Sequence, residues 1–147
     1  MIEKLTVSEQ SIVQPIIEHG GHYRLINTVI YTWGIKQIVI NKGLIFDGAS
    51  VPYLLRIFLS PMDTRVVSSS LIHDCLYEHP NLEGVGHYYE GGALVNRTFS
   101  KLEADDLFRA ANIANNMDWF RTFLAYLAVR FFGKGTFRHW HNKQPLP

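Results

Sequence analysis

The sequence predicts an α+β protein: a small N-terminal antiparallel β-sheet or hairpin, followed by a helical C-terminal two-thirds with a packed antiparallel helix pair. Residues 22–41 (HYRLINTVIYTWGIKQIVIN) are rich in β-branched and aromatic residues, and Gly34 divides them into two runs, which is typical of a hairpin. From Pro52 the pattern becomes helical, and Ser100 with Glu103 forms a capping box that opens a further helix.

Prolines and glycines divide the chain into its elements. Pro15 disfavours a long helix in residues 1–18, and residues 42–52 (KGLIFDGASVP) indicate a short extended piece that leads into a tight loop. Pro80 and four glycines make residues 80–98 a long loop or a short ribbon. The expected helices lie at residues 52–60, 60–79, about 101–116 and about 118–132.

The composition predicts one domain over residues 1–147, because 147 residues with 47% hydrophobic content can bury a sizeable core. We expect residues 1–51 to be mainly β, residues 52–133 mainly α, and residues 134–147 an extended tail. The formal net charge of +1 argues against a nucleic-acid-binding module, so no nucleic-acid partner is expected. Cys75 is the single cysteine, which excludes an internal disulfide.

No signal-peptide pattern opens the chain, since MIEKLTVSEQ contains two acids and no apolar run. The longest apolar region, residues 119–133, is interrupted by Arg121 and Arg130 and is too short to span a bilayer. We therefore expect synthesis in the cytoplasm.

The last predicted helix carries an apolar stripe made of Phe120, Phe123, Leu124, Leu127 and Phe131. The simplest interpretation is the core face of an amphipathic helix, and the alternative is a surface that faces a membrane or a partner. The aromatic, basic segment at residues 136–143 (TFRHWHNK) is expected to anchor the chain on another subunit, because such residues are enriched at interfaces.

The segment SSSLIHDCLY (68–77) places a histidine beside an aspartate on a predicted helix. His73 and Tyr77 are four positions apart and share one helix face, whereas Asp74 is turned away by about 100°. The three small serines let another backbone approach closely. Cys75 faces away from His73 and is expected to pack in the core.

The helix that follows carries EADDLF (103–108), so Asp105 or Asp106 reaches the His73 ring if the two helices run antiparallel. A carboxylate that accepts a hydrogen bond from one imidazole nitrogen fixes the tautomer. The other nitrogen is then free to take a proton from water.

Asp74 is a candidate ligand for a hard cation such as Ca²⁺, because carboxylate and carbonyl oxygens suit such ions. The loop FDGASVP would complete the site, with Asp47 as a second carboxylate and Gly48 allowing carbonyls to be presented. A mononuclear site formed by His73, Asp74 and His87 is an alternative. The other histidines lack zinc-site spacings.

HDCLY followed by EADDLF resembles the pattern of phospholipase A2 enzymes, in the disulfide-free form carried by some viral capsid proteins. The resemblance implies that His73 is the water-activating base, oriented by Asp105 and supported by the hydroxyl of Tyr77. It also implies that Asp74 binds calcium, that the calcium loop falls on residues 46–50, and that the substrate is a lipid ester.

A second resemblance covers roughly residues 45–110, where FDGASVP, LIHDCLY and ADDLF occur in order. This series is similar to a family of small phage and prophage domains of unknown function. It implies a bacteriophage origin. We separately expect synthesis in the host cytoplasm and association with the virion. Other phage structural proteins, or further copies of the chain held through the aromatic C-terminal region, would be the partners.

Two functions remain open. In the first, the protein is a calcium-dependent hydrolase of a membrane lipid or of another ester or amide of the cell envelope. In the second, it is a non-enzymatic virion component of the tail or head, and the polar residues around His73 form a buried brace between helices. Ser50 is disfavoured as a nucleophile, because no G-x-S-x-G motif surrounds it.

Overall fold

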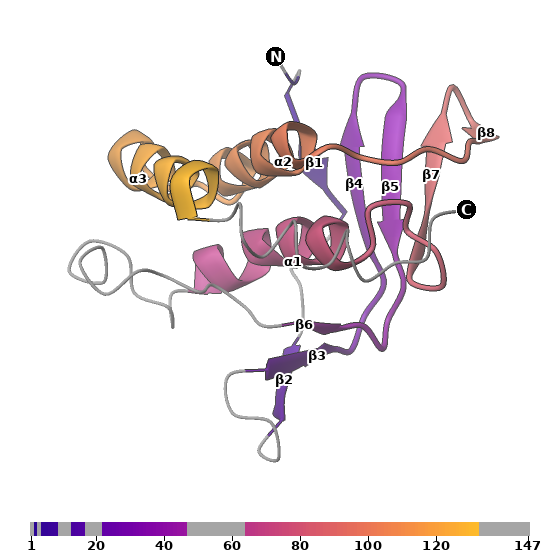
Figure 1. Cartoon of the computed structure of the whole chain (residues 1–147), viewed down its shortest axis with the longest axis horizontal. Helices are drawn as coiled ribbons and strands as arrows, with labels where there is room; N and C mark the ends of the chain where they lie inside the picture. The colour runs from indigo at the N-terminus through magenta and orange to yellow at the C-terminus, as the bar shows by residue number, and fades with distance from the viewer. Residues whose placement is uncertain (1, 3, 9–12, 17–21, 47–63, 133–147) are drawn as a thin grey trace.

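The computed structural model describes residues 2, 4–8, 13–16, 22–46 and 64–132. The elements in chain order are β1 (Thr6–Val7), β2 (Val13–Ile16), β3 (His22–Leu25), β4 (Val29–Trp33), β5 (Lys36–Ile40), β6 (Ile45–Phe46), α1 (Thr64–Glu78), β7 (Gly86–Glu90), β8 (Ala93–Leu94), α2 (Lys101–Ala114) and α3 (Trp119–Phe132) (Figure 1). The predicted α+β arrangement is confirmed. The predicted helix at 52–60 and the predicted tail at 134–147 lie outside the described residues.

The strands form two antiparallel sheets, ordered β1-β4-β5-β7-β8 and β2-β3-β6. Strands β4 and β5 form the predicted hairpin, which turns at Gly34 with a φ of +58°. Strand β3 was expected in the same hairpin but pairs with β2 and β6 instead. The glycine-rich segment at 80–98 contains the ribbon β7–β8, which extends the larger sheet beyond β5.

Strand β7 approaches β5 closely at Gly86. A Cβ atom at this position would lie 2.2 Å from the carbonyl oxygen of Val39, which is closer than any real contact. The pairing of β5 with β7 therefore requires a residue without a side chain here.

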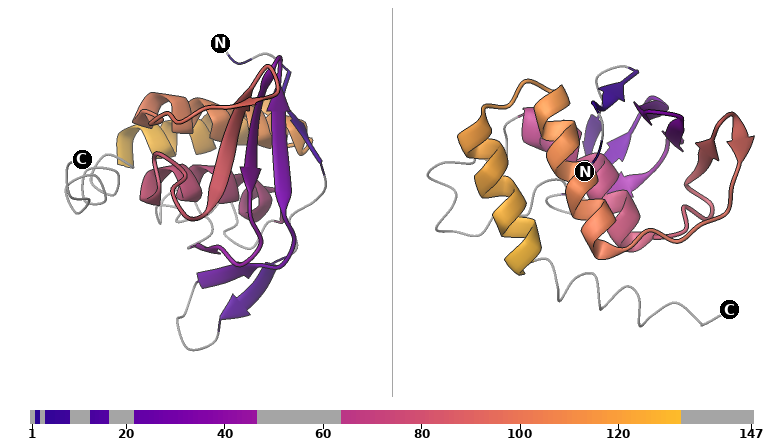
Figure 2. Two further views of the ribbon diagram at one scale, coloured as in Figure 1. Left: turned by 90° about the vertical axis from the view of Figure 1, so that its right-hand side faces the viewer. Right: turned by 90° about the horizontal axis from the view of Figure 1, so that it is seen from above.

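The three helices lie over one face of the larger sheet (Figure 2). Alternate residues of β4 and β5 point into the core, among them Tyr31 and Ile38, as expected for strands with one buried face. Leu71 and Leu76 of α1 and Leu107 of α2 belong to the same buried cluster. The core thus holds α1 and α2 at fixed positions on the sheet.

Helices α1 and α2 run antiparallel. The Nδ2 atom of Asn115 donates to Oγ of Ser69 over 3.0 Å, and the hydroxyl of Tyr77 donates to Asp105 two turns further along α1. The serine run is buried where the structure describes it, which agrees with its expected role in close helix approach.

Helix α2 begins with the predicted capping box. The backbone N–H of Glu103 donates to Oγ of Ser100 over 3.1 Å, and the backbone N–H of Ser100 donates to Oε1 of Glu103 over 3.2 Å. The start of this helix, and so the position of Asp105 within it, is therefore fixed by local hydrogen bonds.

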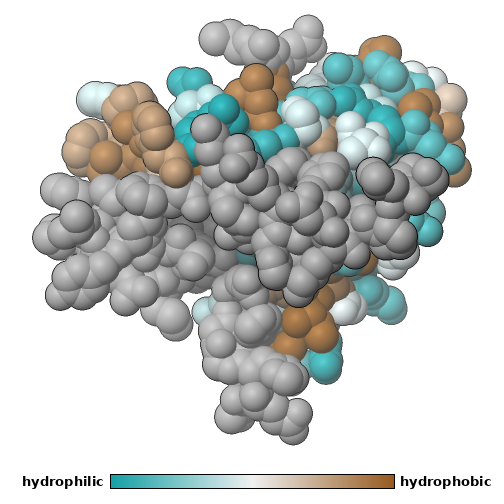
Figure 3. Space-filling model, viewed as in Figure 1, coloured by the Kyte–Doolittle hydropathy of each residue, from teal (hydrophilic) through white to brown (hydrophobic). Residues whose placement is uncertain are grey.

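Helix α3 turns much of its apolar stripe outward, and hydrophobic residues gather over it on the surface (Figure 3). Its exposed aromatic residues are Trp119, Phe120, Phe123 and Phe131. The expectation of a core face is therefore wrong for the three phenylalanines. The physical reason is that Ala125 packs against Phe108 and Arg130 reaches Asp105, and together these contacts fix the rotation of α3. Within the described residues, no helix is long and apolar enough to cross a membrane.

Candidate functional site

The carboxylate of Asp105 is fully buried between the three helices and accepts four hydrogen bonds. Its Oδ1 atom lies 2.9 Å from Nε2 of His73 and 2.5 Å from the hydroxyl of Tyr77. Its Oδ2 atom lies 2.7 Å from Nζ of Lys101 and 2.8 Å from a guanidinium nitrogen of Arg130. Every lone-pair direction of the buried carboxylate is therefore used, as a buried charge requires.

The secondary structure explains why these groups meet. His73 and Tyr77 are one turn apart on α1, and their rings lie 3.9 Å apart between centroids. Lys101 is one turn before Asp105 on α2. The Nζ atom of Lys101 also donates to the carbonyls of Val129 and Arg130, at 3.0 and 3.3 Å, and so satisfies groups in the last turn of α3.

Asp105 is anionic at neutral pH. Burial alone would raise its pKa, but the hydrogen bonds from His73, Lys101 and Tyr77 outweigh this and lower the pKa to about 2. The pKa of Tyr77 shifts upward, because burial and the hydrogen bond to Asp105 both disfavour the ionised phenol. Tyr77 therefore stays protonated and acts as a donor.

His73 lies between two carboxylates and is 7% exposed. Its Nε2 atom faces Asp105, and its Nδ1 atom lies 3.6 Å from Oδ1 of Asp74. The expectation that Asp74 points away from the ring is therefore wrong. Adjacent Cβ atoms diverge by about 100° around a helix, but both side chains are long enough to curve back toward each other.

The two carboxylates determine how His73 titrates. Burial lowers its pKa, but the interactions with Asp105 and Asp74 are larger in sum and raise the pKa above its ordinary value. Phe108 packs on the ring at 5.0 Å between centroids. When His73 is neutral, Asp105 holds the proton on Nε2, and Nδ1 carries the lone pair.

The predicted grouping of His73, Tyr77 and Asp105 is found in the structure, and Cys75 is buried in the core as expected. Sequence reasoning missed Lys101 and Arg130. Lys101 carried a usable signal, because a lysine four positions before an aspartate on a helix forms a pair. Arg130 was seen only as an interruption of an apolar region, although a cation in such a region needs a partner.

Asn112 is a further buried polar residue on the face of α2 that carries Asp105. The two residues are seven positions apart, which is about two helical turns. The Asn112 side chain is completely buried, and neither its Nδ2 nor its Oδ1 atom has a hydrogen-bond partner among the described residues. An unsatisfied buried amide is costly, so this position is a weak point in the packing of the helices.

Within the described ranges, no group of three or more His, Cys, Asp or Glu side chains is placed to hold a metal ion. The alternative site with His73, Asp74 and His87 is therefore wrong, and His87 is exposed on β7. Asp47 and Gly48, the other expected cation ligands, lie outside the described residues.

The comparisons with known proteins identify a family. The family model described as "Protein of unknown function (DUF1353)" matches residues 23–129, which include α1, α2 and most of α3. No curated protein and no solved structure shows significant similarity to the chain. The match covers more than half of the sequence, and the chain therefore belongs to the DUF1353 family of proteins of unknown function.

Proposed function

We propose that this protein is a phage-encoded hydrolase, similar in mechanism to phospholipase A2, in which His73 activates water. One observation carries the proposal. Asp105 engages the Nε2 atom of His73 at 2.9 Å and is itself held by Tyr77, Lys101 and Arg130. This arrangement presets the tautomer in which the opposite nitrogen, Nδ1, accepts a proton.

The proton transfers need this nitrogen and one water molecule. Neutral His73 takes a proton from water at Nδ1, while the water oxygen attacks the carbonyl carbon of the ester. The tetrahedral intermediate then breaks its bond to the alcohol oxygen, which receives the proton from Nδ1. The products are a carboxylic acid and an alcohol, and His73 is neutral again.

Asp74 is the proposed cation ligand, with Asp47 and carbonyls of residues 46–50 completing the site and Ca²⁺ as the preferred ion. A cation here would serve two purposes. It would stabilise the developing oxyanion. It would also offset the negative charge of Asp74, which lies 3.6 Å from Nδ1, and so lower the pKa of His73, which favours the neutral ring.

A membrane lipid ester is the proposed substrate. The outward aromatic residues of α3 support this choice, because aromatic side chains favour the boundary between water and lipid. Arg130 lies on the same helix and contacts Asp105, which in turn contacts His73. Helix α3 and His73 are therefore connected through the carboxylate of Asp105. Another ester or amide of the cell envelope is the alternative substrate.

A specific observation favours a second function. His73 is only 7% exposed, and all four donors around Asp105 are paired. These are features of a brace that holds three helices together. In this second proposal the protein is a non-enzymatic virion component, which binds other phage structural proteins or further copies of itself through its aromatic C-terminal region.

A calcium titration of the full chain distinguishes the hydrolase from the non-enzymatic brace. If the protein is a hydrolase, calcium should lower the pKa of His73, as measured by NMR. Calcium should also be required for hydrolysis of phosphatidylglycerol vesicles. His73→Gln should abolish hydrolysis while the fold is kept, and Asp74→Asn should remove the response to calcium. The control Asp118→Asn changes a carboxylate paired with Arg121 away from the site.

The brace proposal expects other results. Wild type would show no hydrolysis with or without calcium, and the pKa of His73 would not respond to calcium. This combination would remove the hydrolase from consideration.

A further inference from the structure

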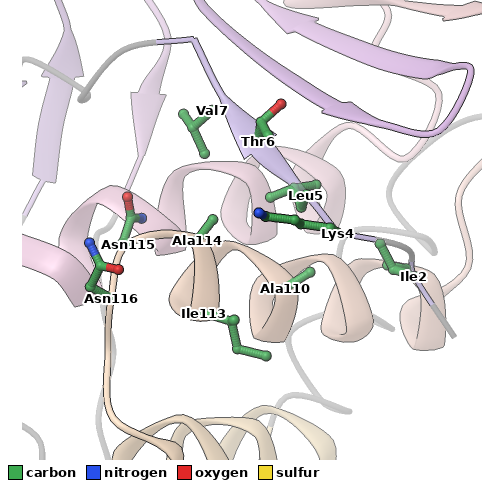
Figure 4. Close-up of a pocket in the computed structure, with 10 residues that line it drawn as sticks. All are labelled: Ile2, Lys4, Leu5, Thr6, Val7, Ala110, Ile113, Ala114, Asn115 and Asn116. Atoms are coloured by element: carbon green, nitrogen blue, oxygen red, sulfur yellow. The ribbon is translucent and has the colours of Figure 1, made fainter.

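A groove of about 830 Å³ separates β1, with the residues just before it, from the C-terminal half of α2 (Figure 4). The strand side is formed by residues 2 and 4–7, and the helix side by residues between Ala110 and Asn116. Neither side includes a residue of the His73 site. The family match begins at residue 23, so the strand side of the groove precedes the matched region.

Among the described strands, β1 lies at the edge of the sheet and pairs with β4 alone. Its other side is not paired with any described residue. The N–H of Ser8 donates to the carbonyl of Ile30 over 2.8 Å, so residue 8 faces β4. Because main-chain groups alternate along an antiparallel strand, the N–H and C=O of Val7 point away from β4. Val7 also lines the groove, so an extended chain lying there has main-chain partners available.

The helix side of the groove is apolar and has room for side chains. Ala110 and Ala114 are partly buried and pack against the core, and their methyl groups leave space above them. Ile113 is 58% exposed beside them. Alternate side chains of an added strand would point toward this surface, as Leu5 and Val7 do from β1.

The groove also has a charge preference. Lys4 is exposed and forms no ion pair with any described residue, and none of the described residues that line the groove is an Asp or a Glu. Lys4 and Thr6 lie on the face of the strand opposite to Leu5 and Val7. A residue paired with Lys4 across an added strand would therefore be on the solvent face, where an acidic side chain gives a favourable pair.

We propose that this groove binds an extended segment of a partner polypeptide, which adds to the free edge of β1 as a further strand. The segment has apolar residues at alternate positions, facing Ala110 and Ala114, and one acidic residue opposite Lys4. This interaction is separate from any chemistry at His73, because none of the residues that line the groove belongs to that site.

The test uses the full chain labelled with ¹⁵N and a capped eight-residue peptide of alternating valine and threonine with one glutamate in place of a threonine. Binding should shift the amide signals of residues 4–8 and 110–116 and slow hydrogen exchange of the Val7 amide. A matched peptide with lysine instead of glutamate should bind more weakly, by about two- to fivefold.

Two variants keep the proposal falsifiable. Lys4→Glu changes an exposed residue and should reverse the preference between the two peptides. Ile113→Glu places a charge on the apolar side and should weaken both peptides alike. The proposal is overturned if neither peptide binds at millimolar concentration, if the shifts fall elsewhere, or if Lys4→Glu leaves the preference unchanged. It is also overturned if the free protein is a dimer whose Val7 amide is already protected, since the groove would then bind a second copy.

Discussion

The Nε2 atom of His73 lies 2.9 Å from Oδ1 of Asp105, across the interface between α1 and α2. The second oxygen of Asp105 holds Lys101 from α2 and Arg130 from α3. A single buried carboxylate therefore connects the three helices that the structure describes. Its removal should affect both the packing of the helices and the titration of His73.

Asp105→Asn should destabilise the fold by about 3–5 kcal/mol, because it leaves Lys101 and Arg130 without a counter-charge in a partly buried site. Asp106→Asn is the matched control. Asp106 is the next residue and accepts a 3.3 Å bond from Tyr126, so its loss should cost less than about 1 kcal/mol. Urea denaturation of the two variants measures the difference, and equal losses would contradict the central role of Asp105.

The pKa values of His73 and His79 should depart from the ordinary value in opposite directions. Burial lowers the pKa of His79, whereas the pKa of His73 is raised because Asp105 and Asp74 outweigh its burial. Asp74→Asn should lower the pKa of His73 and leave His79 nearly unchanged. An NMR titration of the imidazole signals of wild type and of Asp74→Asn measures the pKa values of both histidines in each protein. A His73 pKa below that of His79 would show that the carboxylates do not control the ring.

His73 should also make stability depend on pH. Its folded pKa is above the unfolded value of about 6.5, so protonated His73 stabilises the fold. This contribution is complete below about pH 6.5 and is lost as the pH rises through the folded pKa. His73→Gln should lack this loss of stability. Thermal unfolding of both proteins from pH 5 to pH 9 provides the comparison, and parallel curves would exclude the linkage.

Asn112→Leu should raise stability by about 1 kcal/mol or more, because an apolar side chain of similar shape removes two unsatisfied buried atoms. The control Asn115→Leu should lower stability, since it removes the 3.0 Å hydrogen bond that Asn115 donates to Ser69 at the end of α2. Urea denaturation measures both. A loss of stability in Asn112→Leu would indicate that the amide holds a water molecule or a ligand.

Local patterns were sufficient for several features. The capping box at Ser100 and Glu103 placed the start of α2, because it depends on backbone groups within one turn. The turn at Gly34 located the β4–β5 hairpin for a similar reason. Helical spacing put His73 and Tyr77 on one face, and antiparallel packing of the next helix then brought Asp105 to the same ring.

The sequence by itself therefore determined the helices, the β4–β5 hairpin and the face shared by His73 and Tyr77, because dihedral preferences and short-range hydrogen bonds act over a few residues. It left Asp105 and Asp106 open as the partner of His73, and the tertiary structure selected Asp105. Only the tertiary structure decided which face of α3 is buried, since this depends on Arg130 reaching Asp105, 25 positions earlier in the chain. The same holds for the pairing of β3 in a separate sheet and for the unsatisfied amide of Asn112. These features depend on which distant groups meet when the core closes, and no local pattern encodes that choice.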